Sequence, residues 1–531
     1  MKLVSFDLFD TLISRTYFKP SDLFVHLSEI VYKDFSIKEF YKTRIIEESK
    51  LRSTKKTEIT LDEIYLSIAN KLSIEDGTIN KIKLLELKLE YDSIVINKHY
   101  LNEFNNNLLL KCIITDTYLP KSFIEQIVSD KLLITNIPVF VSSELGFSKF
   151  NSKIFYHVKN YFSINFNEWT HFGDNFFSDY LVPRKLGIYA IHLKNLNLDL
   201  NFSLLKVKNA NESFLMGLIK NHTNNSDLSP FIEYYLRVFV PIQLKVASEI
   251  NNLLKEKSIN KVFFLSRDGK LFYETYAALY GIESSNYLLA SRKALIFPSA
   301  VEDDTLNVDF IFKKIKFSSI NNFISSLSLE KIPEVIFFFK ELEIDFNVEL
   351  SDSLKKKIIL KIKNSKIFLN QLFYIANKRR NIYLDYLKRI GFFENKKVLI
   401  FDLGWHGNMQ TYLERISKGV SDNFIIEGYY FDCLSNNRNF EKFIDSRNTF
   451  NYIYSVNLLE SIFDSDQGSL RYIDEHKNSI SFLHNEQHKI SKDIFLEKRK
   501  ITQIIVNKVL ENSIDLFKVR KELIIQNLTL N

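Results

Sequence analysis

The stretch KLVSFDLFDTLISR, from Lys2 to Arg15, places an apolar run in front of two carboxylates, Asp7 and Asp10. Residues 3–7 have the length and composition of a short buried strand. A strand that ends on an acid delivers a charged side chain to the edge of its sheet. In open α/β sheets, loops converge and ligands bind at this edge. The stretch therefore predicts an α/β fold with a functional group at Asp7.

The residues that follow alternate between helical and strand-like patterns. From Ser21 to about Asn107, apolar residues recur at three- and four-residue spacing, which predicts a helical insert. Beyond it, helical segments separate the apolar runs LLKCIITD, IPVFVSS, EWTHFGD and GIYAIHL. Strands that alternate with helices predict a parallel, doubly wound sheet.

The chain is long enough for more than one domain, since 531 residues exceed what one hydrophobic core usually supports. An Asn- and Ser-rich segment indicates a boundary, and strands and helices alternate again after it. We expect a first domain over 1–200 with the helical insert at about 16–107, a linker over 201–229, a second α/β domain over 230–488 with a helical insertion at about 303–393, and C-terminal helices over 489–531.

Composition restricts the class of protein and its partners. The formal charge of +7 comes from 71 basic and 64 acidic side chains without a long basic block, so no nucleic-acid partner is expected. Cys112 and Cys433 each lie alone in an apolar run, which indicates neither zinc nor a disulfide framework and favours a reducing, cytoplasmic location. Neither a signal peptide nor a membrane span is expected.

Four strand ends of the first domain carry the side chains that phosphoryl transfer requires. Asp7 would attack phosphorus as a nucleophile, and Thr115 would donate its hydroxyl to a phosphoryl oxygen. Lys149 would neutralise the phosphate. Mg²⁺ binds oxygen ligands and would lie between Asp7, Asp174 and a phosphate oxygen. The expected substrate is a phosphorylated small molecule.

These residues resemble the motifs of the haloacid dehalogenase (HAD) superfamily. DLFDTL resembles its first motif with Asp7 as the nucleophile, and Thr115 in IITDT resembles the second. KFNSKIF resembles the third with Lys149, and GDNFFSD resembles the fourth, with Asp174 and Asp179 at the metal site. The resemblance covers about the first 200 residues. It implies a Rossmann-like sheet with a cap inserted after the first strand, and Mg²⁺ as cofactor.

The first motif departs from the family pattern at Phe9. The family's general acid/base stands two residues after the nucleophile, where this chain has Phe9, and Asp10 comes one residue later. On an extended backbone that shift turns the side chain to the opposite face, so Asp10 is either a catalytic residue or a cap of backbone N–H groups. Arg15 would pair with Asp10 or reach the substrate. Dehalogenases also carry an aromatic here, but the GD of the fourth motif favours phosphate chemistry over dehalogenation.

The second domain has its own group of polar strand ends. SRDG supplies Arg267 and Asp268, SRKAL supplies Arg292, and DLGWHGNMQ supplies Asp402, His406 and Gln410. Glycines between a strand and a helix let the backbone approach a phosphate, and arginines can bind an anion with paired donors. These six residues are a candidate second site, with Asp402 or His406 as acid/base. Alternatively, the Arg–Asp neighbours pair only with each other and the histidine is structural.

The combination of both domains is similar to bacterial two-domain HAD-like proteins that accompany capsule or lipopolysaccharide glycosylation. That similarity implies a phosphosugar or nucleotide-sugar substrate, and a homo-oligomer or glycosylation enzymes as partners. Two alternatives remain open: a transferase whose chemistry lies in the second domain, and a non-catalytic assembly protein. The spacing of His484 and His488 in HNEQH resembles a metal-binding helix but is more typical of an exposed one.

Overall fold

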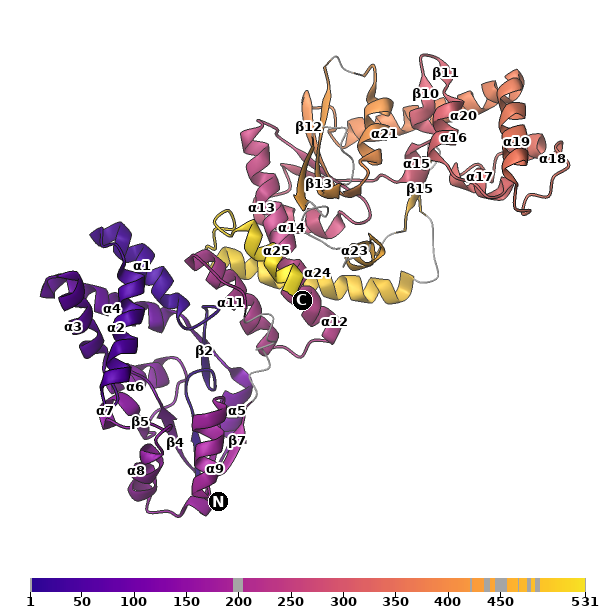
Figure 1. Cartoon of the computed structure of the whole chain (residues 1–531). Coiled ribbons are helices and arrows are strands. Elements are labelled where there is room, and N and C mark those ends of the chain that lie inside the picture. Colours follow the sequence, from indigo (N-terminus) through magenta and orange to yellow (C-terminus); the bar gives the residue numbers. More distant parts are fainter. Residues whose placement is uncertain are drawn as a thin grey trace. The chain divides into compact units, whose positions relative to one another are not determined.

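The computed structural model describes residues 2–193, 204–420, 423–433, 440–444, 456–466, 468–474, 479–482 and 488–530. The chain forms two compact units (Figure 1). Unit 1 contains residues 1–241 and 508–531, and unit 2 contains residues 242–507. Each unit is built on a five-stranded parallel sheet with helices packed against it, so the predicted α/β class is confirmed.

The sheet of unit 1 has the strand order β5-β4-β1-β6-β7. Its strands are β1 (Leu3–Phe6), β4 (Leu110–Thr115), β5 (Val139–Val141), β6 (Trp169–Gly173) and β7 (Tyr189–His192). The chain adds β4 and β5 on one side of β1, and then β6 and β7 on the other. The direction of winding therefore reverses between β1 and β6, which opens a crevice at their carboxyl ends.

Both faces of this sheet are covered, as expected for buried parallel strands. Val4 and Phe6 point into a core shared with the helical insert, while Leu3 packs with Trp169 and the helix α8 on the opposite face. The covering and connecting helices are α6 (Lys121–Asp130), α7 (Ser142–Leu145), α8 (Lys153–Phe162), η1 (Phe166–Glu168), η2 (Phe176–Leu181) and α9 (Val182–Leu186).

The helical insert follows β1, as the sequence predicted. It contains α1 (Asp22–Phe35), α2 (Phe40–Thr54), α3 (Leu61–Leu72), α4 (Asp76–Asp92) and α5 (Lys98–Asn106). The antiparallel strands β2 (Ile13–Arg15) and β3 (Ile94–Ile96) pair where the chain enters and leaves the four-helix part. In the interior of this insert, which we call the cap, Arg44 pairs with Glu86 while both side chains are buried.

Unit 1 is completed by segments that follow the sheet. They are α11 (Ala210–Asn224), α12 (Pro230–Tyr234), η3 (Tyr235–Phe239) and α25 (Lys521–Leu530). Gly217 of α11 approaches the backbone so closely that a Cβ atom would lie 2.0 Å from the carbonyl oxygen of Thr16. Buried Glu212 of the same helix accepts hydrogen bonds from the Arg520 side chain. The C-terminal segment is thus part of this unit.

The sheet of unit 2 has the order β14-β13-β12-β8-β9. Its strands are β8 (Val262–Leu265), β9 (Ser285–Leu288), β12 (Lys397–Trp405), β13 (Ile425–Cys433) and β14 (Phe440–Ile444). Here the winding reverses between β8 and β12, so a second crevice is expected at their carboxyl ends.

Helices and short strands complete unit 2. Those before β12 are α13 (Val240–Glu256), which begins at the unit boundary, α14 (Lys270–Tyr280), α15 (Arg292–Leu295), η4 (Pro298–Ala300), β10 (Val301–Glu302), β11 (Thr305–Leu306), α16 (Val308–Lys314), α17 (Ile320–Ser326), α18 (Pro333–Lys340), α19 (Asp352–Asn364) and α20 (Lys366–Arg389). Those after it are α21 (Asn408–Ser417), α23 (Val456–Phe463), β15 (Leu470–Asp474), β16 (Ser479–Phe482) and α24 (His488–Glu511), which crosses the unit boundary after Asn507.

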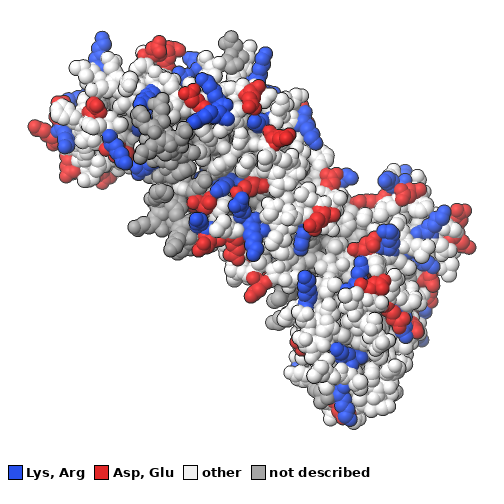
Figure 2. Space-filling view, turned by 180° about the vertical axis from the view of Figure 1, so that it is seen from behind, with Lys and Arg blue, Asp and Glu red and all other residues white. Residues whose placement is uncertain are grey.

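The cysteines, the surface charges and the helices bear on the expectations from composition. Cys112 and Cys433 are free and buried. Acidic and basic side chains are interspersed over the face shown in Figure 2. Within the described part of the chain, every helix is too short or too polar to cross a membrane. The histidine pair of HNEQH lies outside the side chains that the structure describes.

Candidate active site

The crevice of unit 1 gathers the side chains that the sequence singled out at separate strand ends. Asp7 follows β1, Thr115 ends β4, and Asp174 follows β6. One carboxylate oxygen each of Asp7, Asp174 and Asp179 lies within 4.8 Å of the others. Asp7 and Asp179 are buried, whereas Asp174 is partly exposed. The crevice therefore opens to solvent on the side of Asp174.

Lys149 binds two of these carboxylates at once. Its Nζ atom lies 2.5 Å from Oδ1 of Asp7 and 2.5 Å from Oδ1 of Asp179, and its side chain is buried. Burial acts to lower the pKa of Lys149, but the charges of Asp179 and Asp7 raise it overall. The lysine is therefore a fixed cation beside the Asp7 carboxylate, as required where two anions must meet.

The three carboxylates have different electrostatic surroundings. Burial raises the pKa of Asp7 against the opposing charge of Lys149. Burial, together with the charges of Asp10 and Asp179, raises the pKa of Asp174 to about 7. Burial also acts to raise the pKa of Asp179, but Lys149 and His171 hold it well below its usual range. Asp179 is thus the carboxylate that most firmly keeps its negative charge.

A buried hydrogen-bond chain holds Asp179 from behind. His171 Nε2 lies 3.2 Å from Asp179 Oδ1, and His171 Nδ1 lies 2.7 Å from the Ser5 hydroxyl. The Trp169 indole N–H donates to the Ser5 oxygen at 2.7 Å. Burial lowers the pKa of His171, so the ring is neutral. Because the Ser5 oxygen accepts from Trp169, its hydroxyl hydrogen is available to donate to Nδ1 of His171. The proton of the neutral ring is then on Nε2, which donates to Asp179, and each of these atoms has a partner.

The backbone around Asp179 is fitted to its carboxylate. The Asn175 N–H donates to Asp179 Oδ2 at 3.1 Å. A Cβ atom on Gly173 would lie 2.5 Å from both Cβ and Cγ of Asp179, so any larger residue at this position would displace the Asp179 side chain. Both Asp179 oxygens therefore already accept from donors of the protein. This arrangement suits a role in positioning Lys149 better than a role as a metal ligand.

Asp116 orients the backbone of the loop that carries Lys149, and the sequence did not indicate this role. Both of its carboxylate oxygens accept the backbone N–H of Lys149 at 3.0 Å. Thr115, the predicted hydroxyl donor, is buried at the end of β4. At this second strand end, Asp116 therefore holds the loop that bears Lys149, and Thr115 precedes it directly in the chain.

The first loop turns at Asp10 instead of continuing as a strand. Asp10 has a φ of 56°, in the left-handed region, so the expectation of an extended backbone is wrong here. Its charge raises the pKa of Asp174, which places it at the crevice. Within the described residues, Asp10 accepts no backbone hydrogen bond, so the alternative in which it caps N–H groups is not supported. Arg15 pairs with Glu90, not with Asp10.

The donor set fits a divalent cation that prefers oxygen. Asp7 and Asp174 each present a carboxylate to the common space, and the Thr11 hydroxyl orients Oδ2 of Asp7 from 3.4 Å. Mg²⁺ is commonly held by one or two carboxylates together with substrate phosphate and water. Asp7 and Asp174 are therefore the residues that would hold it.

The crevice of unit 2 contains a separate pocket with a volume of about 280 Å³. It lies at the ends of β8, β9 and β12, where the direction of winding reverses. Of the residues predicted for a second site, five line it: Arg267, Asp268, Arg292, Asp402 and His406. The sixth, Gln410, lies outside this lining. Its buried side chain donates to the Ile426 carbonyl and accepts from the Tyr430 hydroxyl.

The arginines of this second pocket differ in their surroundings. Arg267 Nε donates to Asp268 at 2.9 Å and also lies 3.2 Å from Asp464. The expected pairing of Arg267 with Asp268 is therefore present, and a third residue extends it. Arg292 begins the short helix α15 beside the same pocket. The lining combines cations, carboxylates and an exposed imidazole at His406.

Comparisons with known proteins give remote similarities. No protein-family model matches the sequence, and no curated protein is significantly similar to it. Among solved structures, a 2-haloacid dehalogenase from Pseudomonas syringae pv. Tomato is 14% identical, with a TM-score of 0.29 over 37% of this chain and 88% of that one. A HAD phosphatase from Thermococcus onnurineus is 15% identical, with a TM-score of 0.28 over the same shares. We therefore derive function from the side-chain geometry.

Proposed function

We propose that unit 1 is a Mg²⁺-dependent phosphohydrolase or phosphotransferase of the HAD type, acting on a small phosphorylated substrate with Asp7 as its nucleophile. One observation carries this proposal: Lys149 lies 2.5 Å from Asp7, while the oxygens of Asp7, Asp174 and Asp179 lie within 4.8 Å of one another. A nucleophilic carboxylate, a fixed cation and a group of oxygen donors are the components that phosphoryl transfer requires.

The side chains would divide the reaction as follows. Asp7 attacks phosphorus, the bond to the leaving oxygen breaks, and an aspartyl phosphate forms. Lys149 neutralises the attacking carboxylate and the phosphoryl group, and Thr115 donates a hydrogen bond to a phosphoryl oxygen. Asp179 holds Lys149 in place through the contact at 2.5 Å. Bound Mg²⁺ would offset the negative charge of the phosphoryl group.

Phe9 affects both proton transfers of the reaction. No carboxyl group occupies the position of the family's acid/base, so protonation of the leaving oxygen and activation of water need another group. Asp10 is the candidate that the first loop offers, because its charge acts on Asp174 at the crevice. General acid/base help typically contributes about 10²- to 10⁴-fold. We therefore expect slow hydrolysis and an aspartyl phosphate that persists long enough for transfer to an acceptor other than water.

The substrate class follows from the resemblance of the motifs in both units. We propose a phosphosugar or a nucleotide-sugar-related compound, with a cytoplasmic role in surface polysaccharide synthesis. The discriminating experiment is phosphate release from a panel of sugar phosphates, with and without EDTA. The variants are Asp7→Asn and, as a matched control, Asp92→Asn on the exposed surface of the cap.

Three readouts decide this proposal. Release should require Mg²⁺, be lost in Asp7→Asn and persist in Asp92→Asn. Acid-stable, hydroxylamine-labile labelling from a ³²P-sugar phosphate would identify the aspartyl phosphate on Asp7. Equal traces for wild type and Asp7→Asn would refute nucleophilic catalysis by this residue.

A second candidate function has its own supporting observation, the pocket at the winding reversal of unit 2. Arg267 and Arg292 beside Asp402 and His406 suit a transferase acting on an anionic donor. Loss of turnover in Arg292→Gln with retention in Asp7→Asn would favour this function. If neither variant changes any activity, and neither crevice binds Mg²⁺ or a sugar phosphate, the protein is a non-catalytic assembly component.

A further inference from the structure

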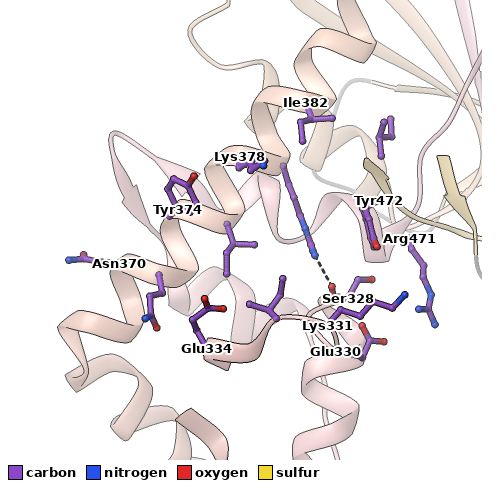
Figure 3. A pocket seen from close by; sticks show the side chains of 15 residues that line it. Ser328, Glu330, Lys331, Glu334, Asn370, Tyr374, Lys378, Ile382, Arg471 and Tyr472 are labelled. Atoms are coloured by element: carbon purple, nitrogen blue, oxygen red, sulfur yellow. Dashed lines mark hydrogen bonds between the residues drawn. The ribbon is translucent and has the colours of Figure 1, made fainter. Parts of the chain in front are cut away.

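Unit 2 contains a larger cavity that shares no lining residue with the pocket at the strand ends. Its volume is about 620 Å³, and it lies between α20, the turn at residues 328–332 with the start of α18, and β15 (Figure 3). This volume is within the range of pockets that enclose small organic ligands, roughly 300–1,000 Å³. The cavity is formed by the helical insertion together with β15 and not by the sheet crevice, so it needs an explanation of its own.

The walls of the cavity are apolar and aromatic. Ile375 and Ile382 face it from α20, and Ile332 faces it from the turn. Two tyrosines, Tyr374 on α20 and Tyr472 on β15, present their rings to the same space (Figure 3). Flat aromatic and branched aliphatic surfaces of this kind favour a planar ring by stacking and by burial of apolar area.

Charged side chains surround these walls with an excess of positive charge. Four lining residues are basic and two are acidic; the basic ones are Lys331, Lys378, Arg379 and Arg471. The two acids are Glu330, on the turn beside Lys331, and Glu334, in the first turn of α18. An anionic group placed between the turn and β15 would therefore meet cations from three different elements.

Part of the cavity is already held in a binding geometry. The two terminal nitrogens of Arg379 donate to the carbonyl oxygens of Leu327 and Ser328, both at 2.7 Å, which fixes the turn against α20. The guanidinium also lies over the Tyr472 ring, 5.1 Å from its centroid. Ser328 is 5% exposed, and its hydroxyl has no hydrogen-bond partner within the described structure. A buried polar group without a partner is costly, and a ligand can remove that cost.

We propose that this cavity binds a small organic anion in which a planar ring is joined to phosphate, the class to which nucleoside phosphates belong. The ring packs against Tyr472 and Ile375, and the phosphate lies near Lys331 and Arg471. The Ser328 hydroxyl hydrogen-bonds to the buried part of the ligand. The site shares no lining residue with the strand-end pocket of unit 2.

The test is calorimetric titration of the full chain with ADP, adenosine and inorganic phosphate, in EDTA to suppress metal-dependent turnover. ADP should bind more tightly than either fragment. The double variant Lys331→Gln/Arg471→Gln should weaken ADP binding roughly tenfold or more, because it removes charge-assisted contacts. Tyr472→Leu should weaken ADP and adenosine together. Lys340→Gln, an exposed change on α18 outside the cavity, should leave all three affinities unchanged.

Other outcomes would overturn the proposal. One is the absence of ADP binding at millimolar concentration. Another is binding that is lost in Arg292→Gln but unaffected by Lys331→Gln/Arg471→Gln, which would place the nucleotide at the strand ends of unit 2. A third is equal affinity for ADP and inorganic phosphate, since the ring would then contribute nothing. Lys331 is exposed and Arg471 is partly exposed, so their replacement by Gln should not disturb folding. The double variant therefore still tests the proposal if Tyr472→Leu fails to fold.

Discussion

The guanidinium of Arg15 covers the ring of Phe9, with 4.2 Å between Arg15 Cζ and the ring centroid. Arg15 is held there by Glu90, whose Oε1 accepts from its Nε at 2.7 Å. The residue two positions after Asp7 is therefore an aromatic ring under a fixed cation. This arrangement is a cation–π contact that stabilises the aromatic residue at this position.

Replacing Phe9 with Asp should not restore efficient turnover. A carboxylate beside Arg15 would remain ionised, because the neighbouring cation lowers its pKa, and an ionised group cannot protonate a leaving oxygen. We expect the rate of phosphate release to rise less than about tenfold, instead of the roughly 10²- to 10⁴-fold of a competent acid/base. Steady-state kcat of Phe9→Asp, with Phe9→Leu as control, measures this. A gain of 100-fold or more would show that Arg15 leaves the new acid free to act.

Gly173→Ala should reduce activity while leaving the chain folded. The added methyl group would lie 2.5 Å from Cβ and Cγ of Asp179, so Asp179 must move and Lys149 must move with it. Misplacement of a catalytic group by about 1 Å can cost roughly 10²-fold in rate. Gly77→Ala is the matched control, since no atom lies within 4 Å of its added Cβ. Equal kcat values for the two variants would contradict the positioning role of Asp179.

The strand-end residues could be predicted because their chemistry is visible in the sequence. A lone carboxylate or lysine directly after an apolar run stands out, and parallel strands bring their carboxyl ends to one edge. Asp7 and Asp174 follow this rule, whereas Lys149 lies between α7 and α8 and was indicated by the resemblance of KFNSKIF to the third motif. The structure adds that Asp179 contacts Lys149 and His171. The order of the motifs does not show this difference between Asp179 and Asp174.

The residues behind the site could not be predicted in the same way. Ser5 and His171 lie inside short, buried and mostly apolar strands, and only the register of β1 against β6 pairs them. Trp169 joins them because it lies two residues before His171, on the same face of β6. The conformation of Asp10 was also hidden, because a left-handed residue here results from tertiary packing of the loop.

Arg44→Met should destabilise unit 1 strongly. Arg44 and Glu86 are buried and share two hydrogen bonds of 2.9 Å, so removing the arginine leaves Glu86 charged and without its cation. Breaking one side of a buried ion pair typically costs about 3–5 kcal/mol of unfolding free energy. Urea unfolding followed by Trp169 fluorescence measures this loss. A Trp405→Phe background removes the only other tryptophan.

The double variant Arg44→Met/Glu86→Met tests the cause of that loss. Two apolar side chains in place of a buried pair are often neutral or stabilising, so most of the lost stability should return. Tyr65 would lose the Glu86 acceptor of its hydroxyl, and a small deficit should remain. If the double variant is as unstable as Arg44→Met, the loss comes from packing and not from an unpaired charge.

His222 should make unit 1 less stable as pH falls. Burial, and then the charge of Lys508, lowers the pKa of His222 from 6.5 to about 4. Its Nδ1 atom lies 3.5 Å from Lys508 Nζ, so a second positive charge is unfavourable there. Below pH 6.5, His222 takes up a proton in the unfolded chain, whereas in the folded chain it stays neutral down to about pH 4. The contribution of neutral His222 to the free energy of unfolding is therefore fully present above pH 6.5 and is lost as the pH falls from 6.5 to about 4. His222→Gln removes the titration. The measurement is the unfolding free energy of the wild-type residue and of His222→Gln, both in the Trp405→Phe background, at pH 7.5 and pH 5. The difference between them should shift in favour of His222→Gln at pH 5. An unchanged difference would contradict this assignment.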